Sequence, residues 1–306
     1  MSRAWIEHAV ADDGGTLVVH ERPGAAPGAP VIVLLHGFTG CHLGWTRVAG
    51  HLPRFRILAP DLPGHGRSRF VDEGDACRME SATRRLGRAL DRLGVSSFTL
   101  AGYSMGGRLA LHFALAEVWR IEALVLESAS PGLEADDERA ARRAADHALA
   151  ASIERDGVEA FLARWQETPV LASQRELRAS LRREAAEERR GNRVAGLAAS
   201  LRGMGTGAQL WLGDRLADLQ VPVTCVAGSG DAKFAAIASN MTGRIPGASL
   251  EILPAGHNVH LEHPEAFARL LGLATDRARR KPGFETTRPH QETDPDLGPL
   301  GRDARA

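Results

Sequence analysis

Residues Leu100 to Leu111 read LAGYSMGGRLAL and contain the pattern G-x-S-x-G, with Ser104 at its centre. The run before the serine, from Ser97 to Ala101, is apolar and typical of a strand, and the run after it is typical of a helix. A serine at such a tight turn takes strained backbone angles and presents its hydroxyl at the edge of a sheet. Small residues two positions before and after it let strand and helix pass close together. The stretch therefore predicts a nucleophile elbow.

The composition allows one large α/β domain with an inserted subdomain. The chain has 306 residues, of which 43% are hydrophobic and 25% are charged, so a sizeable core is expected. Basic and acidic residues balance at 38 each, so no global field attracts nucleic acid or a membrane surface. No apolar run approaches the length of a membrane span. We therefore expect neither a nucleic-acid partner nor insertion into a membrane.

The N-terminal residues and the cysteines indicate the cellular compartment. The first ten residues, MSRAWIEHAV, lack the apolar segment of a signal peptide. Cys41, Cys77 and Cys225 are scattered and odd in number, which is typical of reduced thiols. The expected location is cytoplasmic, and nothing in the sequence indicates the oligomeric state.

Strand patterns alternate with helical patterns along most of the chain, which predicts a mostly parallel sheet covered by helices on both faces. Strands are expected at residues 5–10, 16–21, 31–35, 56–59, 97–101, 123–127, 223–227 and 249–253. Helices are expected at residues 46–52, 79–93, 232–245 and 264–274 and from residue 108 onward, with a turn-rich loop at residues 61–68.

Residues 132–203 break this alternation, because they contain several helical patterns and no strand pattern. We expect them to form a helical cap inserted into a core made of residues 1–131 and 204–275. Residues 276–306 lose periodicity and carry many Pro, Arg, Asp and Gly residues, so we expect a disordered tail.

A serine hydroxyl becomes reactive only beside a base that a carboxylate orients. Asp231 directly follows the expected strand at 223–227, and His257 directly follows the one at 249–253. The carboxyl ends of parallel strands share one edge of a sheet, so both side chains should lie near Ser104. The sequence therefore predicts the triad Ser104, Asp231 and His257. Glu127 also ends an expected strand and remains an alternative for the orienting acid.

The segment from His257 to His263 reads HNVHLEH and raises the possibility of a metal site. Such a site needs further ligands, and none is evident, so we expect no metal and no cofactor. For His260 and His263 the expected role is a solvated or capping one near Pro264.

An oxyanion site needs two hydrogen-bond donors. The backbone N–H of Met105 is one candidate, because it starts the helix after the serine. The second candidate is the N–H of Phe38, in the loop after the expected strand at residues 31–35, where Gly37 permits close backbone approach. His36 in the same loop is expected to be structural.

Several longer motifs carry a family resemblance. LLHGFTG and DLPGHGRS are widespread, whereas GYSMGGRLAL is narrower. More specific still are ESASPGLEADDERAARRAADHALA, FLARWQETPVLAS, LRGMGTGAQ, GSGDAKF and AGHNVHLEHP. On these motifs, from Val31 to Pro264, the chain resembles the α/β-hydrolase superfamily and, within it, the menaquinone-pathway 2-succinyl-6-hydroxy-2,4-cyclohexadiene-1-carboxylate synthases. One departure is that many relatives carry glycines where this chain has Ser128 and Ala129.

The resemblance implies a carbon–oxygen lyase on an α/β-hydrolase fold. Such an enzyme eliminates pyruvate from 2-succinyl-5-enolpyruvyl-6-hydroxy-3-cyclohexene-1-carboxylate. His257, oriented by Asp231, would take the proton of Ser104, whose oxygen would then remove a ring proton next to a carboxylate. No acyl-enzyme is required.

The implied substrate is a small polycarboxylate with three carboxylates. Arginine suits carboxylates because its guanidinium can donate two parallel hydrogen bonds to one carboxylate. The resemblance places Arg108, Arg142 and Arg189 in the substrate site. Arg143 and Arg190 are adjacent and remain alternatives for the last two. Residues 132–203 hold 13 Arg against 13 acidic residues, so most of these arginines are expected to be solvated or paired.

Tyr103 and Trp165 also match substrate-pocket positions of the family, with core packing as the alternative. A serine carboxylic-ester or carbon–carbon bond hydrolase with the same triad remains an alternative function. A non-catalytic binding protein is disfavoured because no triad member is missing. A dehalogenase is disfavoured because those enzymes carry Asp where this chain has Ser104.

Overall fold

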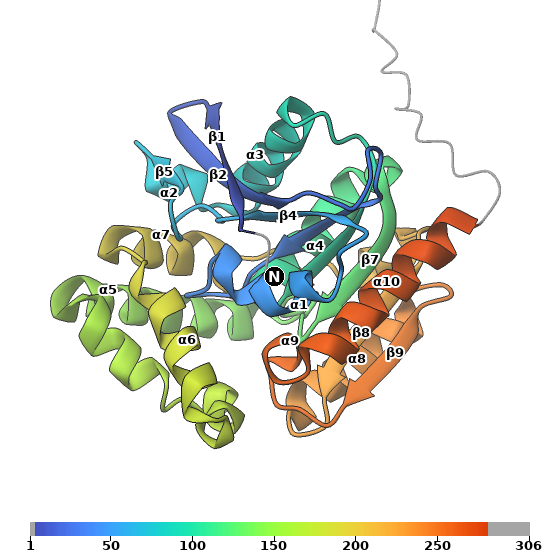
Figure 1. Cartoon of the computed structure of the whole chain (residues 1–306). Helices are drawn as coiled ribbons and strands as arrows, with labels where there is room; N and C mark the ends of the chain where they lie inside the picture. The colour runs from blue at the N-terminus through green and yellow to red at the C-terminus, as the bar shows by residue number, and fades with distance from the viewer. Residues whose placement is uncertain (1–3, 281–306) are drawn as a thin grey trace, which may run out of the picture.

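The computed structural model describes residues 4–280 and contains a nine-stranded sheet (Figure 1). The strand order is β1-β2-β4-β3-β6-β7-β8-β9, with β5 paired to β2. The pairs from β4 to β9 are parallel, and the pairs that involve β2 are antiparallel. The strands are β1 (Ile6–Asp12), β2 (Gly15–Arg22), β3 (Val31–Leu35), β4 (Arg56–Pro60), β5 (Arg69–Phe70), β6 (Phe98–Tyr103), β7 (Ile121–Glu127), β8 (Val223–Gly228) and β9 (Ser249–Leu253).

The central strands are apolar because both of their faces are covered. Every residue of β6 and β7 is buried, and so are the last four residues of β3. The edge strand β9 is mostly exposed or half-buried, as its position predicts. The sequence prediction of an N-terminal hairpin followed by a mostly parallel sheet is confirmed.

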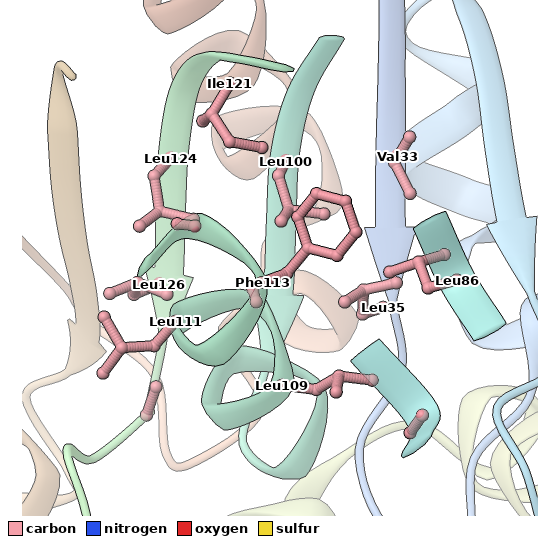
Figure 2. Packing of buried hydrophobic residues seen from close by; sticks show 14 of the residues in the cluster. Val33, Leu35, Leu86, Leu100, Leu109, Leu111, Phe113, Ile121, Leu124 and Leu126 are labelled. Carbon is pink, nitrogen blue, oxygen red and sulfur yellow. The ribbon is translucent and has the colours of Figure 1, made fainter. Parts of the chain in front are cut away.

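Helices cover both faces of the sheet, as expected. One face packs against α3 (Met79–Arg92), α4 (Met105–Ala116) and α8 (Ala232–Arg244), and the other against α1 (Thr46–Gly50) and α10 (Pro264–Arg280). Figure 2 shows Phe113 of α4 beside Leu100 of β6, and Leu109 of the same helix near Leu35 of β3. Burying each such side chain is worth roughly 1.5–3 kcal/mol. This packing holds α4, and hence the serine at its start, rigidly on the sheet.

A helical insertion lies between β7 and β8. It consists of α5 (Asp136–Trp165), η3 (Pro169–Glu176), α6 (Ala179–Arg190) and α7 (Val194–Met204). Figure 1 shows these helices, in green to yellow, gathered on one side of the molecule. Gly157, at φ 82° and ψ 169°, breaks α5 into two helical pieces. Ile153, Phe161 and Leu197 belong to a small separate core between α5 and α7.

Three features differ from the sequence predictions. The segment after residue 68 contains the short strand β5 and the short helix α2 (Glu73–Ala76), neither of which has a recognisable periodicity. Short 3-10 helices, including η1 (His42–Trp45) and η4 (Gly213–Asp218), were not expected either. The prediction of a disordered tail from Asp276 is wrong up to Arg280, because α10 continues to that residue.

The longer α10 has a physical reason. Leu271, Thr275 and Ala278 form a buried stripe at helical spacing, and the Thr275 hydroxyl donates to Thr99 Oγ1 at 2.9 Å. The rest of the predicted tail, residues 281–306, lies outside the described residues. Among residues 4–280, no helix combines the length and the apolar character needed to cross a lipid bilayer.

Candidate active site

Ser104 lies at the turn between β6 and α4 with φ 52° and ψ −109°, angles that L-residues rarely adopt. A Cβ on Gly102 would lie 2.3 Å from the Gly106 carbonyl oxygen, and a Cβ on Gly106 would lie 2.3 Å from that of Leu35. Both positions therefore require glycine, which is why the pattern spaces them around the serine. The backbone N–H of Ser104 donates to the Glu127 carbonyl at 2.8 Å and fixes the turn to β7.

His257 and Asp231 meet Ser104 at the carboxyl edge of the sheet. The Nε2 atom of His257 lies 3.1 Å from Ser104 Oγ, and its Nδ1 atom lies 2.6 Å from Asp231 Oδ2. Burial acts to raise the pKa of Asp231, but hydrogen bonds from His257 and from the Phe234 N–H outweigh it and leave that pKa lowered. The carboxylate is thus ionised at neutral pH and can hold the imidazole with Nδ1 protonated, leaving Nε2 free to accept a proton.

The alternative acid, Glu127, serves a different histidine. Its Oε2 atom lies 2.8 Å from His260 Nδ1, and its Oε1 accepts the His260 backbone N–H at 3.0 Å. The expectation of a solvated or capping His260 is wrong, because this residue is buried and stacks on Trp45 at 4.0 Å between ring centroids. His263, by contrast, has its Nε2 atom 2.9 Å from the Pro254 carbonyl. Because His257 and His260 pair with separate carboxylates, the HNVHLEH segment does not converge on one ion.

The two candidate oxyanion donors border the same cavity as Ser104. Met105 is the first residue of α4, where backbone N–H groups have no partner within the helix. Phe38 follows β3, and a Cβ on Gly37 would lie 2.7 Å from the Tyr103 ring, so this loop passes close to the site. His36 is structural, since Nδ1 donates to the Gly37 carbonyl and Nε2 accepts the Leu62 N–H. Burial lowers the pKa of His36 to about 4, which keeps the ring neutral.

The cavity has a volume of about 590 Å³, enough for a drug-sized ligand. It lies between the carboxyl edge of the sheet and the helical insertion, and both contribute to its lining. Ser104 and His257 line it from the core, whereas Leu149, Trp165 and Arg189 line it from the insertion.

All three predicted arginines border this cavity. Arg108 and Arg189 are each only 9% exposed, whereas the Arg142 side chain is 47% exposed. Arg108 donates to Gln209 Oε1 at 3.0 Å, and Arg189 donates to Gln174 Oε1 at 2.7 Å. The alternatives Arg143 and Arg190 are exposed and do not belong to the lining.

Tyr103 and Trp165 combine lining with packing. Tyr103 is 9% exposed, and its ring centroid lies 5.4 Å from that of His257. Trp165 borders the cavity, stacks on Phe161 and meets Phe38 edge-on at 5.5 Å. Both aromatic residues therefore line the cavity and also pack against neighbouring rings.

Sequence reasoning missed two polar residues of the site. Glu188 borders the cavity, its Oε1 accepts the Cys41 N–H at 2.9 Å, and burial raises its pKa. Gln209 is 1% exposed and contacts Arg108. Each lies beside or within a feature that the sequence analysis names: Glu188 directly precedes Arg189, and Gln209 is the last residue of the motif LRGMGTGAQ.

One further cluster has metal-ligating residue types. Ligand atoms of His20, His42 and Asp61 lie within 4.8 Å of one another. The two imidazole rings are stacked, with centroids 3.3 Å apart and planes 14° apart. A metal bonds an imidazole nitrogen in the ring plane at about 2.0–2.1 Å, and two parallel stacked rings cannot both meet that condition for one ion. In this geometry the cluster is a hydrogen-bonded one, with Asp61 Oδ1 also accepting the His42 N–H at 2.9 Å.

Comparisons with known proteins agree with this architecture. Residues 30–264 match the family model described as alpha/beta hydrolase fold. The chain is 39% identical over 267 residues to a "Putative 2-succinyl-6-hydroxy-2,4-cyclohexadiene-1-carboxylate synthase" of Bacillus subtilis, covering 87% of this chain and 93% of the relative. It is 35% identical over 241 residues to the synthase of that name from Klebsiella pneumoniae, covering 78% and 91%. A solved structure of MenH from S. aureus superposes with a TM-score of 0.81 at 30% identity, covering 85% of this chain and 98% of that one.

The family model spans more than half of the chain. The two synthases are more than 30% identical to this chain across nearly their whole length. The sequence motifs that carried the resemblance, apart from DLPGHGRS, contribute residues to the lining of this cavity. This chain therefore belongs to the α/β-hydrolase superfamily and, within it, to the family of 2-succinyl-6-hydroxy-2,4-cyclohexadiene-1-carboxylate synthases.

Proposed function

We propose that this protein is a lyase of menaquinone biosynthesis. It eliminates pyruvate from 2-succinyl-5-enolpyruvyl-6-hydroxy-3-cyclohexene-1-carboxylate and leaves 2-succinyl-6-hydroxy-2,4-cyclohexadiene-1-carboxylate. The observation that carries the proposal is one cavity that joins a Ser–His–Asp arrangement to three arginines. Membership of the synthase family supports the same choice.

The positions of the double bonds define the proton that must leave. The substrate has one ring double bond at carbon 3, and the product has two, at carbons 2 and 4. The proton therefore leaves carbon 2, which carries the succinyl group, and the enolpyruvyl oxygen leaves carbon 5. Because a succinyl group is attached through a carbonyl, the carbon 2 proton is adjacent to a ketone and is acidified by it. This assignment replaces the expectation of a ring proton acidified by a neighbouring carboxylate.

The proposed triad performs this proton transfer. His257 Nε2, 3.1 Å from Ser104 Oγ, accepts the serine proton while Asp231 holds the other ring nitrogen. The serine oxygen then takes the carbon 2 proton, and the electron pair forms the bond between carbons 2 and 3. The original double bond moves to carbons 4 and 5 as the C5–O bond breaks. The released enolpyruvate takes a proton and tautomerises to pyruvate.

The N–H groups of Phe38 and Met105 are the proposed oxyanion donors. Charge develops on the succinyl carbonyl oxygen as the carbon 2 proton leaves, and preorganised donors stabilise such charge by about 3–4 kcal/mol each. This use explains why a lyase would keep a hydrolase-type oxyanion site without forming a tetrahedral intermediate.

Recognition of the substrate is assigned to Arg108, Arg142 and Arg189, with Tyr103 and Trp165 forming apolar walls. Three arginines match the three carboxylates of the substrate in number. Buried arginines without a carboxylate contact are unfavourable unless an anion arrives, which favours a polyanion over a neutral ester. Arg108 and Arg189 are of this kind within the described part of the chain.

The same triad geometry supports a second candidate function, hydrolysis of a carboxylic ester or of a carbon–carbon bond. In that case Ser104 would act as a nucleophile, and the arginines would have no ligand of matching charge. The two functions thus predict different partners for the same serine.

Two organisational points belong to the proposal. Residues 132–203 act as a cap over a core formed by residues 1–131 and 204–275, supported by the helices α5 to α7 between β7 and β8. The three cysteines are free and buried, which fits a reducing compartment such as the cytoplasm.

The test is turnover of the enolpyruvyl substrate by the purified protein, following pyruvate release and the absorbance of the cyclohexadiene together. Equal rates of both signals, with negligible cleavage of a short p-nitrophenyl ester, are expected. Fast ester cleavage without pyruvate would instead establish the hydrolase.

A further inference from the structure

The Arg108 guanidinium is buried without an acidic contact. It lies on α4 one turn after Ser104, is 9% exposed and borders the cavity. Within residues 4–280 no carboxylate oxygen pairs with it inside 4.0 Å, whereas Arg142, which borders the same cavity, pairs with Asp146. Its side-chain hydrogen bond goes to a neutral group, the amide oxygen of Gln209, at 3.0 Å.

Gln209 is itself held firmly. It is 1% exposed, its backbone N–H donates to the Gly205 carbonyl at 3.2 Å, and its Nε2 atom lies 3.5 Å from the Ser130 carbonyl. A guanidinium only donates, so the amide oxygen must face Arg108 and the amide nitrogen must face Ser130. The orientation of the side chain is therefore determined by both neighbours.

The segment that carries Gln209 also supports Arg142, which lies on α5 in the helical insertion. The Gly207 N–H donates to Asp146 Oδ2 at 3.4 Å, and Asp146 Oδ1 accepts from Arg142 Nε at 2.8 Å. A Cβ on Gly207 would lie 2.2 Å from the backbone nitrogen of Arg143, so the segment packs directly on α5. One short connection after α7 thus positions an arginine on each side of the cavity.

The two arginines differ in how their charge is used. Arg142 contacts a carboxylate and is half-exposed, so its charge is largely balanced. The side-chain hydrogen bond that residues 4–280 give Arg108 goes to an amide, which supplies geometry without a counter-charge, and Asp146, which contacts Arg142, acts on Arg108 without contacting it. Burial lowers the pKa of Arg108 to about 10, which still leaves it charged at neutral pH.

We infer that Gln209 is a positioning residue, whose amide oxygen orients the Arg108 guanidinium while leaving its positive charge free for a carboxylate of the ligand. A glutamate in the same place would still offer the guanidinium an acceptor but would neutralise its charge. The identity of that carboxylate as one of the enolpyruvyl substrate rests on the proposed function. The chemistry of the site, a buried cation that borders a cavity and contacts no carboxylate among residues 4–280, requires only an anionic ligand.

The decisive variant is Gln209→Glu, because it keeps the size and the acceptor that faces Arg108 and adds a negative charge, at the loss of the long 3.5 Å contact with the Ser130 carbonyl. Gln209→Leu removes the acceptor together with the Ser130 contact, and Gln220→Glu is the matched control, since Gln220 is exposed and its side chain donates to the Ala217 carbonyl. Each protein is assayed for kcat and KM with the enolpyruvyl substrate. Thermal stabilisation by citrate, a tricarboxylate that does not react, is measured in parallel.

For Gln209→Glu we expect KM to rise by about tenfold or more, with kcat within about threefold of wild type and an unchanged melting temperature. Citrate should stabilise the wild type and Gln220→Glu but not Gln209→Glu. Gln209→Leu should raise KM and lower kcat, because the guanidinium loses its orientation. Unchanged KM and citrate response in Gln209→Glu would overturn the inference, and so would a collapse of kcat at unchanged KM.

The citrate arm separates this inference from the proposed function. A wild type that responds to citrate but releases no pyruvate, with the response lost in Gln209→Glu, would refute the synthase and keep the role of Gln209. A wild type that turns over the substrate while Gln209→Glu is indistinguishable from it would keep the synthase and refute that role.

Discussion

The core and the helical insertion form opposite sides of the cavity, and they are built in different ways. On the core side, Ser104 and His257 follow strands that pack in a parallel sheet, and β6 is buried throughout. On the insertion side, α5 spans 30 residues of which only five are buried. The core side positions short side chains through its packed backbone, whereas the insertion lines the cavity with the long side chains of Arg142 and Arg189. In the proposed function, reaction geometry therefore depends on the packing of the core, and the share of recognition that falls to the insertion depends on long side chains.

The electrostatics differ in the same sense. The core keeps the buried His36 and His65 neutral, since burial lowers the pKa of His36 to about 4 and that of His65 to about 3. The insertion carries exposed ion pairs such as Arg202 with Glu154. Its one histidine, His147, is exposed. We expect acid to act mainly on the core and ionic strength mainly on the insertion.

The largest effect should come from the core side. Ser104→Ala removes the proposed base and is expected to lower kcat at least about 10³-fold, with little change in stability. Pyruvate release is the measurement, and Ser96→Ala, at an exposed serine, is the control. Residual turnover within tenfold of wild type would show that the serine is not the reacting group.

The next largest effect should come from the insertion side and should fall on KM. Arg189→Ala deletes a buried cation at the cavity and is expected to raise KM by about 10- to 100-fold, with kcat within a few-fold. Arg190→Ala changes the exposed neighbour and should leave both constants unaltered. Equal effects of the two variants would mean that overall charge, rather than this position, matters.

Acid should weaken the core in a defined window. The unfolded chain protonates His36 and His65 below pH 6.5, whereas the folded protein does so only near pH 4 and pH 3, so it binds fewer protons between these values. The free energy of unfolding should therefore fall as the pH drops below 6.5, by about 2 kcal/mol per histidine at pH 5.

Urea unfolding at pH 7 and pH 5 measures this loss. His65→Gln should remove part of the pH dependence, whatever it does to stability at pH 7, and His51→Gln, at an exposed histidine, should leave the dependence intact. A free energy of unfolding that does not change between the two pH values would contradict the prediction.

The smallest effect is expected at the surface pair that joins the two regions. Arg47 of α1 donates to both carboxylate oxygens of Glu184 in α6, but the side chains are 35% and 53% exposed. A double-mutant cycle with Arg47→Gln and Glu184→Gln should give a coupling below about 1 kcal/mol, decreasing with salt. A coupling above about 2 kcal/mol, or a shift in KM, would mean that this pair holds the insertion over the cavity.

Much of the molecule could be predicted from local pattern. The glycines around Ser104, the continuous apolar run of β3 and the positions of Asp231 and His257 after β8 and β9 are local features, because each follows from backbone sterics or burial over a few residues. Arg189 and Arg108 needed the family resemblance, since composition alone does not distinguish them from other arginines.

Other features depend on residues far apart in the sequence. The pairing of Glu127 with His260 joins positions 133 apart, and the contact of Arg108 with Gln209 joins positions 101 apart. The strand β5 has only two residues and exists because β2 offers it a partner. The extension of α10 to Arg280 likewise depends on the sheet surface beneath Leu271 and Thr275.

By itself, the sequence determined the order of strands and helices, the elbow and the chain order of serine, acid and histidine. These are encoded by periodicity, glycine placement and turn residues, which act within a few positions of each other. Only the tertiary structure decided which acid serves which histidine, which arginines face the cavity and which of them contacts an amide instead of a carboxylate. Such choices depend on distances of 2.6–3.1 Å between side chains from separate elements, and no local pattern records those distances.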